Sequence, residues 1–287
     1  MTWTNYHSHC HYCDGKEAPE KHLESAIEKG LICYGFSSHT PVPFDSVWNM
    51  KNEDFPKYLA EINALKKKYE DQIEVYVGLE TDYVPGLLKI DQEEKENLGL
   101  DYTVGSIHFT GEKKNGGPCE IDGPHNTFLE GLQTSYEGDV EAFISRYFEL
   151  TRMMLKEACP DVLGHMDKIK MQDEDGKLFS ETANWYQKAV LETLEEISNS
   201  GVIVEVNTRG VYKKKTVETY PSKWILEHLL ELKVPIMLNS DSHVPSEITS
   251  YFGETAEILQ NIGFKELMIL KEGNWQPAEY SKDGLKL

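Results

Sequence analysis

The chain has 287 residues, 39% of them hydrophobic, and its 49 acidic against 29 basic residues give a formal net charge of −20. This length and apolar content suffice for a full hydrophobic core, either in one α/β barrel or in two smaller domains. The negative charge disfavours nucleic acid and anionic membrane surfaces as partners, and no apolar run reaches the ~18 residues that span a bilayer.

Short apolar segments typical of buried strands alternate with segments of helical periodicity along the whole chain. The predicted strands are residues 3–6, 32–36, 73–79, 102–107, 162–163, 202–206, 236–238 and 266–270. The predicted helices are residues 19–29, 55–69, 140–158, 183–199 and 222–232. This alternation predicts an α/β fold with a parallel sheet, and the lack of a Pro/Gly/Ser-rich linker favours a single domain over residues 1–287.

The ends of the strands favour a closed barrel over an open doubly wound sheet. An open sheet usually carries a glycine-rich phosphate loop after its first strand, whereas here the first strand leads into His7-Ser8-His9. Polar residues follow nearly every predicted strand, which is typical of a barrel with one functional rim. The longest irregular stretch, residues 109–135, is rich in glycine and is predicted to be an active-site loop or lid.

The cysteines indicate reduced thiols. Their number is five and they are widely spaced, which does not suit a disulfide framework. Cys10 and Cys13 have CxxC spacing, but no second CxxC completes a zinc site, and we do not assign the pair a dedicated redox or zinc function. The start of the chain has no basic region followed by an apolar one, so we expect a cytoplasmic protein.

Histidines are concentrated where strands end. Six of the ten histidines follow a predicted strand: His7, His9, His39, His108, His165 and His243. Ligands built on a barrel lie where parallel strands stop and their loops begin. Two residues that are two positions apart at a strand end point to the same face, so His7 and His9 can reach one ion. The pattern predicts a polynuclear metal site.

Carboxylates complete this ligand pattern. Glu80 ends an apolar strand, where an unpaired carboxylate is costly but one that bridges two cations is suitable; the alternative is that Glu80 caps a turn or pairs with a lysine. Asp241 and His243 repeat the spacing of the first two histidines with one ligand type changed. A mixed set of imidazoles and carboxylates suits Zn, Mn or Fe.

Basic side chains at the same rim are candidates for binding an anion. Arg209 follows the strand at 202–206, and its guanidinium suits phosphate; the alternative is a structural salt bridge. Lys168 and Lys170 are weaker candidates for the same task. The run of lysines at 213–215 is interpreted as a solvated turn.

The remaining histidines receive structural interpretations. His22 and His228 lie in predicted helices and are expected at the surface or in packing. His11 is expected to pack or to contact solvent. His125, in the long loop, is left open.

Taken together, these motifs resemble those of the polymerase and histidinol phosphatase (PHP) superfamily. The matching runs, in chain order, are His7-Ser8-His9, Ser37-Ser38-His39, Gly78-Leu79-Glu80, Ser106-Ile107-His108, Gly164-His165-Met166-Asp167 and Asp241-Ser242-His243. Within the superfamily, the run from Glu205 to Gly210 and the chain length are most similar to the monofunctional histidinol-phosphatases. Ser38 stands where the family more often has Asp.

The resemblance implies a distorted (β/α)7 TIM-like barrel of the PHP type that holds three divalent metal ions. With eight strand candidates, one end strand is expected to pair irregularly. Carried over by motif, the first ion takes His7, His9, Glu80 and Asp241. The second shares Glu80 and adds His108 and His165, and the third takes Asp14, His39 and His243.

The resemblance also implies a metal-dependent phosphomonoesterase that hydrolyses L-histidinol phosphate in histidine biosynthesis. Two cations near ~4 Å apart activate a water, clamp the phosphorus and neutralise the leaving oxygen. Asp241, His243 and Arg209 are the expected catalytic residues. The expected substrate-binding residues are Arg209, Asn207, Lys170 and Glu120, with Asp122 as a further candidate.

Two alternatives stay open. One is a PHP-type phosphoesterase of other specificity, such as a phosphodiesterase, a nuclease or a phosphotyrosine phosphatase. The other is a metal-binding protein without turnover, which is disfavoured because structural sites are usually closed by four ligands, whereas this set leaves positions for water.

Overall fold

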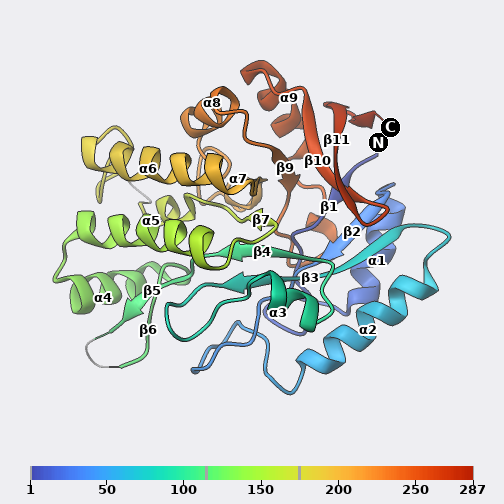
Figure 1. Cartoon of the computed structure of the whole chain (residues 1–287), viewed down its shortest axis with the longest axis horizontal. Helices are drawn as coiled ribbons and strands as arrows, with labels where there is room; N and C mark the ends of the chain where they lie inside the picture. The colour runs from blue at the N-terminus through green and yellow to red at the C-terminus, as the bar shows by residue number, and fades with distance from the viewer. Residues whose placement is uncertain (1, 114–115, 174–175, 287) are drawn as a thin grey trace.

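The computed structural model describes residues 2–113, 116–173 and 176–286. Seven parallel strands form a nearly closed barrel surrounded by helices (Figure 1), in the order β1-β2-β3-β4-β7-β8-β9. These strands are β1 (Thr4–Asn5), β2 (Cys33–Phe36), β3 (Glu74–Asp82), β4 (Tyr102–Ser106), β7 (Val162–Leu163), β8 (Ile203–Asn207) and β9 (Ile236–Asn239). The seven-stranded α/β barrel predicted from the sequence is confirmed.

The barrel closes between β1 and β9 just beyond the ends of these strands. Ser8 and Ser242 form a parallel bridge. The His9 amide donates to the Ser242 carbonyl at 2.8 Å, and the Ser242 amide donates to the His7 carbonyl at 3.2 Å. The segments that complete the barrel are therefore the ones that carry the first and last predicted metal ligands.

Amphipathic helices cover the outside of the barrel (Figure 1). They are α1 (Pro19–Glu28), α2 (Phe55–Lys68), α3 (Gln92–Asn97), α4 (His125–Tyr136), α5 (Val140–Glu157), α6 (Asn184–Ser200), α7 (Arg209–Tyr212), α8 (Lys223–Glu231) and α9 (Phe252–Ile262), with 3-10 turns η1 (Lys168–Gln172) and η2 (Pro245–Glu247). In α5, Phe143, Tyr147 and Met154 are buried at helical spacing. None of the helices within the described ranges combines the length and apolar character needed to cross a bilayer.

The interior of the barrel is filled by aromatic side chains. Tyr6, Tyr76 and Tyr102 are buried in one cluster with inward-facing residues of the other strands. The Tyr102 ring takes the space left by two glycines, because a Cβ at Gly35 would lie 2.3 Å from its hydroxyl oxygen and a Cβ at Gly78 would lie 2.5 Å from its Cζ. The glycines therefore make room for the ring rather than for a turn.

We expect Gly78→Ala to lower the free energy of unfolding by about 1–3 kcal/mol, because the added methyl group overpacks the barrel interior against Tyr102. Urea denaturation followed by circular dichroism measures this loss. Adding Tyr102→Leu to Gly78→Ala removes the clash, so the two substitutions should not be additive. If Gly78→Ala alone unfolds at the same urea concentration as the native chain, the close packing of Gly78 against Tyr102 is contradicted.

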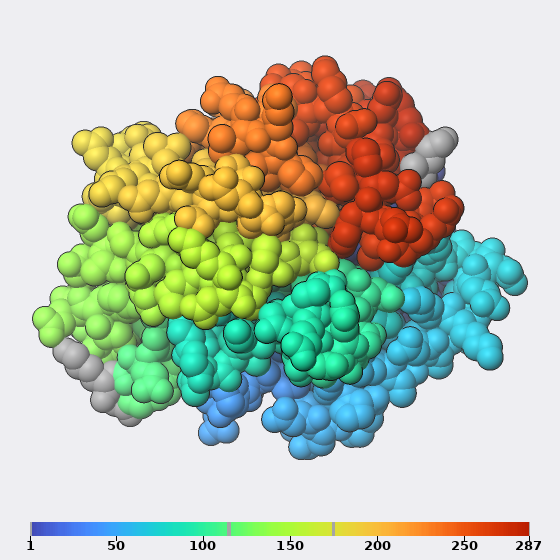
Figure 2. Space-filling view, viewed as in Figure 1, coloured from blue at the N-terminus to red at the C-terminus, as the bar shows by residue number. Residues whose placement is uncertain are grey.

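The C-terminal strands cover the end of the barrel where its strands begin. Strands β10 (Glu266–Lys271), β11 (Asn274–Ser281) and β12 (Gly284–Lys286) form a separate antiparallel sheet. The Tyr6 hydroxyl donates to the Leu270 carbonyl at 2.7 Å and accepts from the Leu270 amide at 3.0 Å. Figure 2 shows this C-terminal segment, in red, packed against earlier parts of the chain. The eighth strand candidate thus lies outside the barrel.

Residues 109–135 are not the irregular stretch expected from their glycines. They contain β5 (Phe109–Glu112), β6 (Pro118–Glu120) and most of α4, while residues 114–115 lie outside the described residues. Cys119, Ile121 and Phe128 are buried in the main core. These apolar side chains hold the segment against the barrel. Gly116, Gly117 and Gly123 lie between its elements at positive φ, whereas Gly111 lies in β5 and Gly131 in α4.

Candidate metal centre

The predicted metal ligands converge at the end of the barrel where the strands finish. Glu80 lies near the end of β3, and His7, His108 and His165 closely follow β1, β4 and β7. These four residues are completely buried. Each of the nine predicted ligands belongs to at least one group whose ligand atoms lie within 4.8 Å of one another.

The groups differ in detail from the division that the resemblance implied. They are His9-Asp14-His39-His243, His7-Glu80-His165, His7-His9-Asp241 and His39-Glu80-His108. His9 thus joins the set assigned to the third ion. His108 and His165 each share a group with Glu80, but with different third members. All nine residues therefore lie close together. Which of them would bind which ion is a proposal.

Glu80 is the centre of this arrangement. Its carboxylate oxygens lie 2.8–3.4 Å from nitrogen atoms of five histidines, namely His7, His9, His39, His108 and His165. The Ser106 hydroxyl donates to Glu80 Oε1 at 2.7 Å. Burial alone would raise the pKa of Glu80, but the imidazoles around it hold that pKa well below its usual range. The carboxylate is therefore ionised.

Several ligand atoms lack a hydrogen-bond partner among the described residues. They are His7 Nε2, His9 Nε2, His39 Nδ1, Glu80 Oε2 and His108 Nε2. Buried polar atoms are nearly always paired, so a cluster of unpaired atoms that face one another needs an explanation. Divalent ions would satisfy these nitrogen and oxygen atoms together, and the donor set suits Zn, Mn or Fe.

Carboxylates behind the histidines orient them. Glu205 Oε1 lies 2.6 Å from His7 Nδ1, and Asp82 Oδ1 lies 2.8 Å from His108 Nδ1. Pairing of Nδ1 with a carboxylate leaves Nε2 free to face the metal site. The sequence analysis missed this role for both residues. A signal existed for Asp82, because it lies two positions after Glu80 and strand residues at that spacing share a face.

Two ligands lie on unusual backbone. Asp241 has φ of 50° and His165 has φ of 20°, values that residues with a Cβ rarely adopt. The turn at Asp241 is held by Arg209 Nη1, which donates to the Asp241 carbonyl at 2.8 Å. The turn at His165 is held by Glu205 Oε2, which accepts from the His165 amide at 2.9 Å. Such strain persists where the surrounding structure over-determines it, as at functional sites.

The centre opens into a cavity of about 500 Å³. Asp14, His39, Asp241 and His243 line its metal side. Trp48, Met171 and Tyr220 supply apolar walls, and four cations also line it: Lys168, Arg209, Lys213 and Lys215. The cavity therefore combines a floor of candidate metal ligands with positive charge, which suits an anionic ligand.

Of the four predicted substrate-binding residues, one lines the cavity and three do not. Arg209 lines the cavity. Asn207 lies behind it, where Nδ2 donates to Glu205 Oε2 at 2.9 Å. Lys170 faces away and donates to Asp167 Oδ2 at 2.9 Å and to two further oxygens. Glu120 lies on β6, two residues before Asp122, and Asp122 is the carboxylate that lines the cavity.

The lysine run at 213–215 lies at the mouth of the cavity. The sequence analysis interpreted this run only as a solvated turn. Lys213 and Lys215 both line the cavity. Lys213 also forms an ion pair with Glu247, a residue of η2. The chain brings the run to the rim because α7 is short and the segment after it turns back across the barrel mouth, with the Tyr220 amide donating to the Asn207 carbonyl at 3.0 Å.

The histidines outside the ligand set have partners of their own. His22 is buried and contacts the Lys16 carbonyl through Nε2 at 2.8 Å. His228 Nδ1 lies 2.8 Å from a carbonyl of its own helix. His125 Nδ1 lies 3.2 Å from Gln172 Oε1. The packing roles expected for His22 and His228 agree with these contacts.

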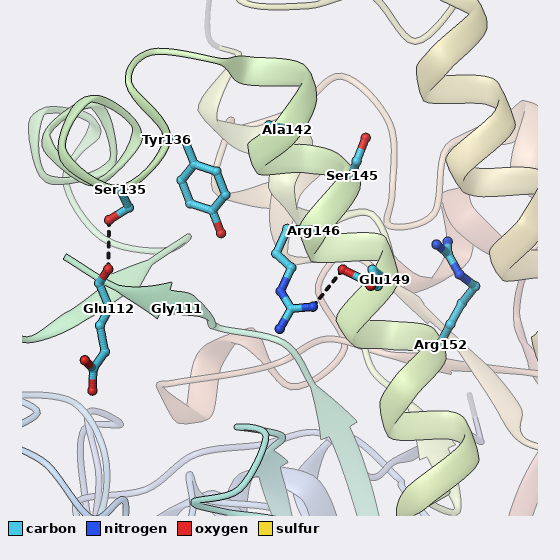
Figure 3. Close-up of a pocket in the computed structure, with 9 residues that line it drawn as sticks. All are labelled: Gly111, Glu112, Ser135, Tyr136, Ala142, Ser145, Arg146, Glu149 and Arg152. Carbon is cyan, nitrogen blue, oxygen red and sulfur yellow. Dashed lines mark hydrogen bonds and ion pairs between the residues drawn. The ribbon is translucent and has the colours of Figure 1, made fainter. Parts of the chain in front are cut away.

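A second hollow, beside β5, α4 and α5, is a weaker candidate (Figure 3). Its two arginines, Arg146 and Arg152, already bind other groups of this chain. Arg146 pairs with Glu149 at 2.7 Å, and Arg152 Nη1 donates to Thr193 Oγ1 at 3.0 Å and to the Ala189 carbonyl at 3.2 Å. The metal-centre cavity therefore remains the candidate functional site.

Comparisons with known proteins relate this chain to a family model and to several named proteins. A family model described as the PHP domain matches residues 5–209. A protein of Deinococcus radiodurans named "Probable histidinol-phosphatase" is 27% identical over 85% of this chain and 87% of its own length. A histidinol-phosphatase of Bacillus subtilis is 24% identical over 84% of this chain and 94% of its own length.

A solved structure has the same fold. It is the histidinol phosphate phosphatase of Lactococcus lactis complexed with Zn, L-histidinol and phosphate; it has a TM-score of 0.69, is 21% identical and covers 100% of both chains. At that identity the likeness shows the fold alone.

Proposed function

The chain belongs to the PHP domain family, and from this premise we propose that it is a metal-dependent phosphomonoesterase that hydrolyses L-histidinol phosphate to L-histidinol and phosphate. The observation that carries the proposal is the convergence of nine candidate ligand residues on one centre, four of which line a cavity together with Arg209. The names of the Deinococcus and Bacillus relatives, and the ligands bound to the Lactococcus protein, support the choice of substrate.

We propose three divalent ions, Zn, Mn or Fe, held by the nine residues, with Glu80 shared between ions. When bound, such ions lower the pKa of a coordinated water and neutralise charge on the phosphoryl oxygens. Burial of the ligands excludes bulk water from the centre, which strengthens each electrostatic contact there. His7 and His108 keep their Nε2 atoms aimed at the site through Glu205 and Asp82.

The reaction needs the phosphate ester to lie over the ligand cluster. Water forms a new P–O bond, the bond to the histidinol oxygen breaks, and a proton passes to that leaving oxygen. Arg209, fixed by its bond to the Asp241 carbonyl, has further N–H groups that can grip phosphate oxygens. Capture of an anion by a chain of net charge −20 then depends on this local positive charge and on the ions.

The remaining parts of the cavity suit the histidinol moiety. Trp48 and Tyr220 offer aromatic surface for its imidazole, and Asp122 offers a carboxylate for its ammonium group. Asp122, Gly123 and Pro124 bring the segment 109–135 to the cavity. We propose that this segment shapes the active site within a single domain, in line with the role expected for it from sequence.

The decisive experiment measures phosphate release by purified, metal-loaded protein. L-histidinol phosphate should be the preferred substrate over a diester, an oligonucleotide and a phosphotyrosine peptide. Asp241→Asn, which removes one ligand charge, serves as the control for contaminating phosphatases and should be inactive while folded by circular dichroism. Failure of metal-replete protein to release phosphate from L-histidinol phosphate would overturn the proposal.

A further inference from the structure

A buried lysine lies directly beside the metal centre. Lys168 is the first residue of η1, three positions after His165, and its amide donates to the His165 carbonyl at 2.9 Å. This tight turn directs the side chain back toward the ligands. Its Nζ lies 3.4 Å from His165 Nε2 and 4.0 Å from Asp241 Oδ2. The whole residue is only 8% exposed, although it lines the cavity.

Asp122 holds the Lys168 ammonium in this place. Its Oδ2 atom lies 2.9 Å from Lys168 Nζ, and the same atom lies 3.5 Å from His108 Nε2. Asp122 comes from the segment between β6 and α4, so two separate parts of the chain meet to position one positive charge. Burying a lysine is costly unless its charge is paired, and the pairing here points the ammonium at the cavity.

A comparison with Lys170 distinguishes this arrangement from a structural ion pair. Lys170 Nζ has three oxygen acceptors within 2.9 Å, which match the three donors of an ammonium group. Within the part of the chain that the structure describes, Lys168 Nζ has one carboxylate oxygen at that range, Asp122 Oδ2. Its next neighbour, His165 Nε2, is a proposed metal ligand whose lone pair would be taken by the ion. With the centre loaded, Lys168 therefore keeps donors that face the cavity.

Lys168 and Arg209 both contact Asp241. Lys168 approaches its side chain, whereas Arg209 donates to its carbonyl at 2.8 Å. Both cations line the cavity, so an anion bound over Asp241 would lie near the two of them. Arginine and lysine in such a pair act differently, because the guanidinium forms two parallel bonds and the ammonium acts as a compact point charge.

We propose that Lys168 is a further catalytic residue, whose ammonium binds an oxygen of the phosphate group beside the metal centre, in the cavity that Arg209 also lines. This inference rests on the proposed function for the choice of ester, but the phosphate contact is shared by substrate and product. Inorganic phosphate is therefore a probe of Lys168 that does not depend on the identity of the leaving group.

The test compares Lys168→Met with Lys168→Arg and with Lys188→Met, a charge-removing control at an exposed position of α6 outside the cavity. Phosphate affinity is measured by calorimetry on metal-loaded protein, and metal content is measured on the same samples. Loss of one charge-assisted hydrogen bond should weaken phosphate binding about 10–100-fold in Lys168→Met. Lys168→Arg should recover part of that affinity, and Lys188→Met should change it less than about 3-fold.

The outcomes separate this inference from the proposed function. Unchanged phosphate affinity in Lys168→Met would overturn the role of Lys168, and so would a loss that parallels a loss of bound metal, because Lys168 would then organise the ligands instead. If native protein fails to hydrolyse L-histidinol phosphate yet binds inorganic phosphate in a Lys168-dependent way, the substrate assignment fails and the role of Lys168 stands.

Discussion

Replacing Glu80 with Gln should abolish measurable turnover, with kcat reduced more than about 100-fold. Residues that only orient metal ligands typically contribute 10–100-fold, and Glu80 is more central, since five histidines surround its carboxylate. The amide keeps the shape and can still accept from Ser106, but it cannot supply the negative charge that a shared ligand needs. Phosphate release and metal content of the purified variant measure the effect.

Glu74→Gln is the matched control for this substitution. Glu74 lies at the opposite end of the same strand, β3, where it accepts hydrogen bonds from the Tyr76 hydroxyl and the Glu272 amide. It should lose little activity and no metal. If Glu80→Gln kept both its metal and its rate, the proposed bridging role of Glu80 would be wrong, whatever the substrate.

Removal of the metals should inactivate the protein and lower its melting temperature. Ions that bind only the folded chain stabilise it by about 4 kcal/mol at 1,000 times their dissociation constant, which corresponds to roughly 8–16 °C in a domain of this size. Chelation followed by readdition of Zn, Mn or Fe should reverse both losses. Elemental analysis of the reloaded protein then counts the ions, for which we propose three per chain.

The affinity for metal should fall as the pH is lowered. Burial lowers the pKa of His108, but Asp82 and Glu80 together raise it to about 9. Burial also opposes the charged form of His7, yet Glu205, Glu80 and Asp241 raise its pKa well above the usual value. Both side chains are therefore imidazolium cations at neutral pH in the metal-free chain. A metal that binds must displace one proton from each ring. Affinity that is constant between pH 6 and pH 9 would contradict this picture.

Sequence patterns predicted the barrel and pointed to its candidate ligands because the signals for both are local. Alternating strand and helix signals appear within short windows, and a residue such as Glu80 or His108 can be recognised as strand-terminal from its own apolar run. The C-terminal sheet was recognised only in part, since β11 and β12 carry polar residues and pair with β10 rather than with the barrel. Glycines misled the interpretation of residues 109–135, because buried Cys119 and Phe128 decide the structure there.

By itself, the sequence determined the fold class, eight of the candidate ligands and the position of Arg209, since each depends on residue types at fixed spacing along one strand and its loop, and the family resemblance added Asp14. Only the tertiary structure decided which side chains meet. It joined His9 to the group of Asp14 and His243, placed Glu205 and Asp82 behind the histidines, and brought Lys168 rather than Lys170 to the cavity. Such contacts depend on the closing of the barrel, which brings together residues far apart in the chain, and on turns too tight to be inferred from spacing.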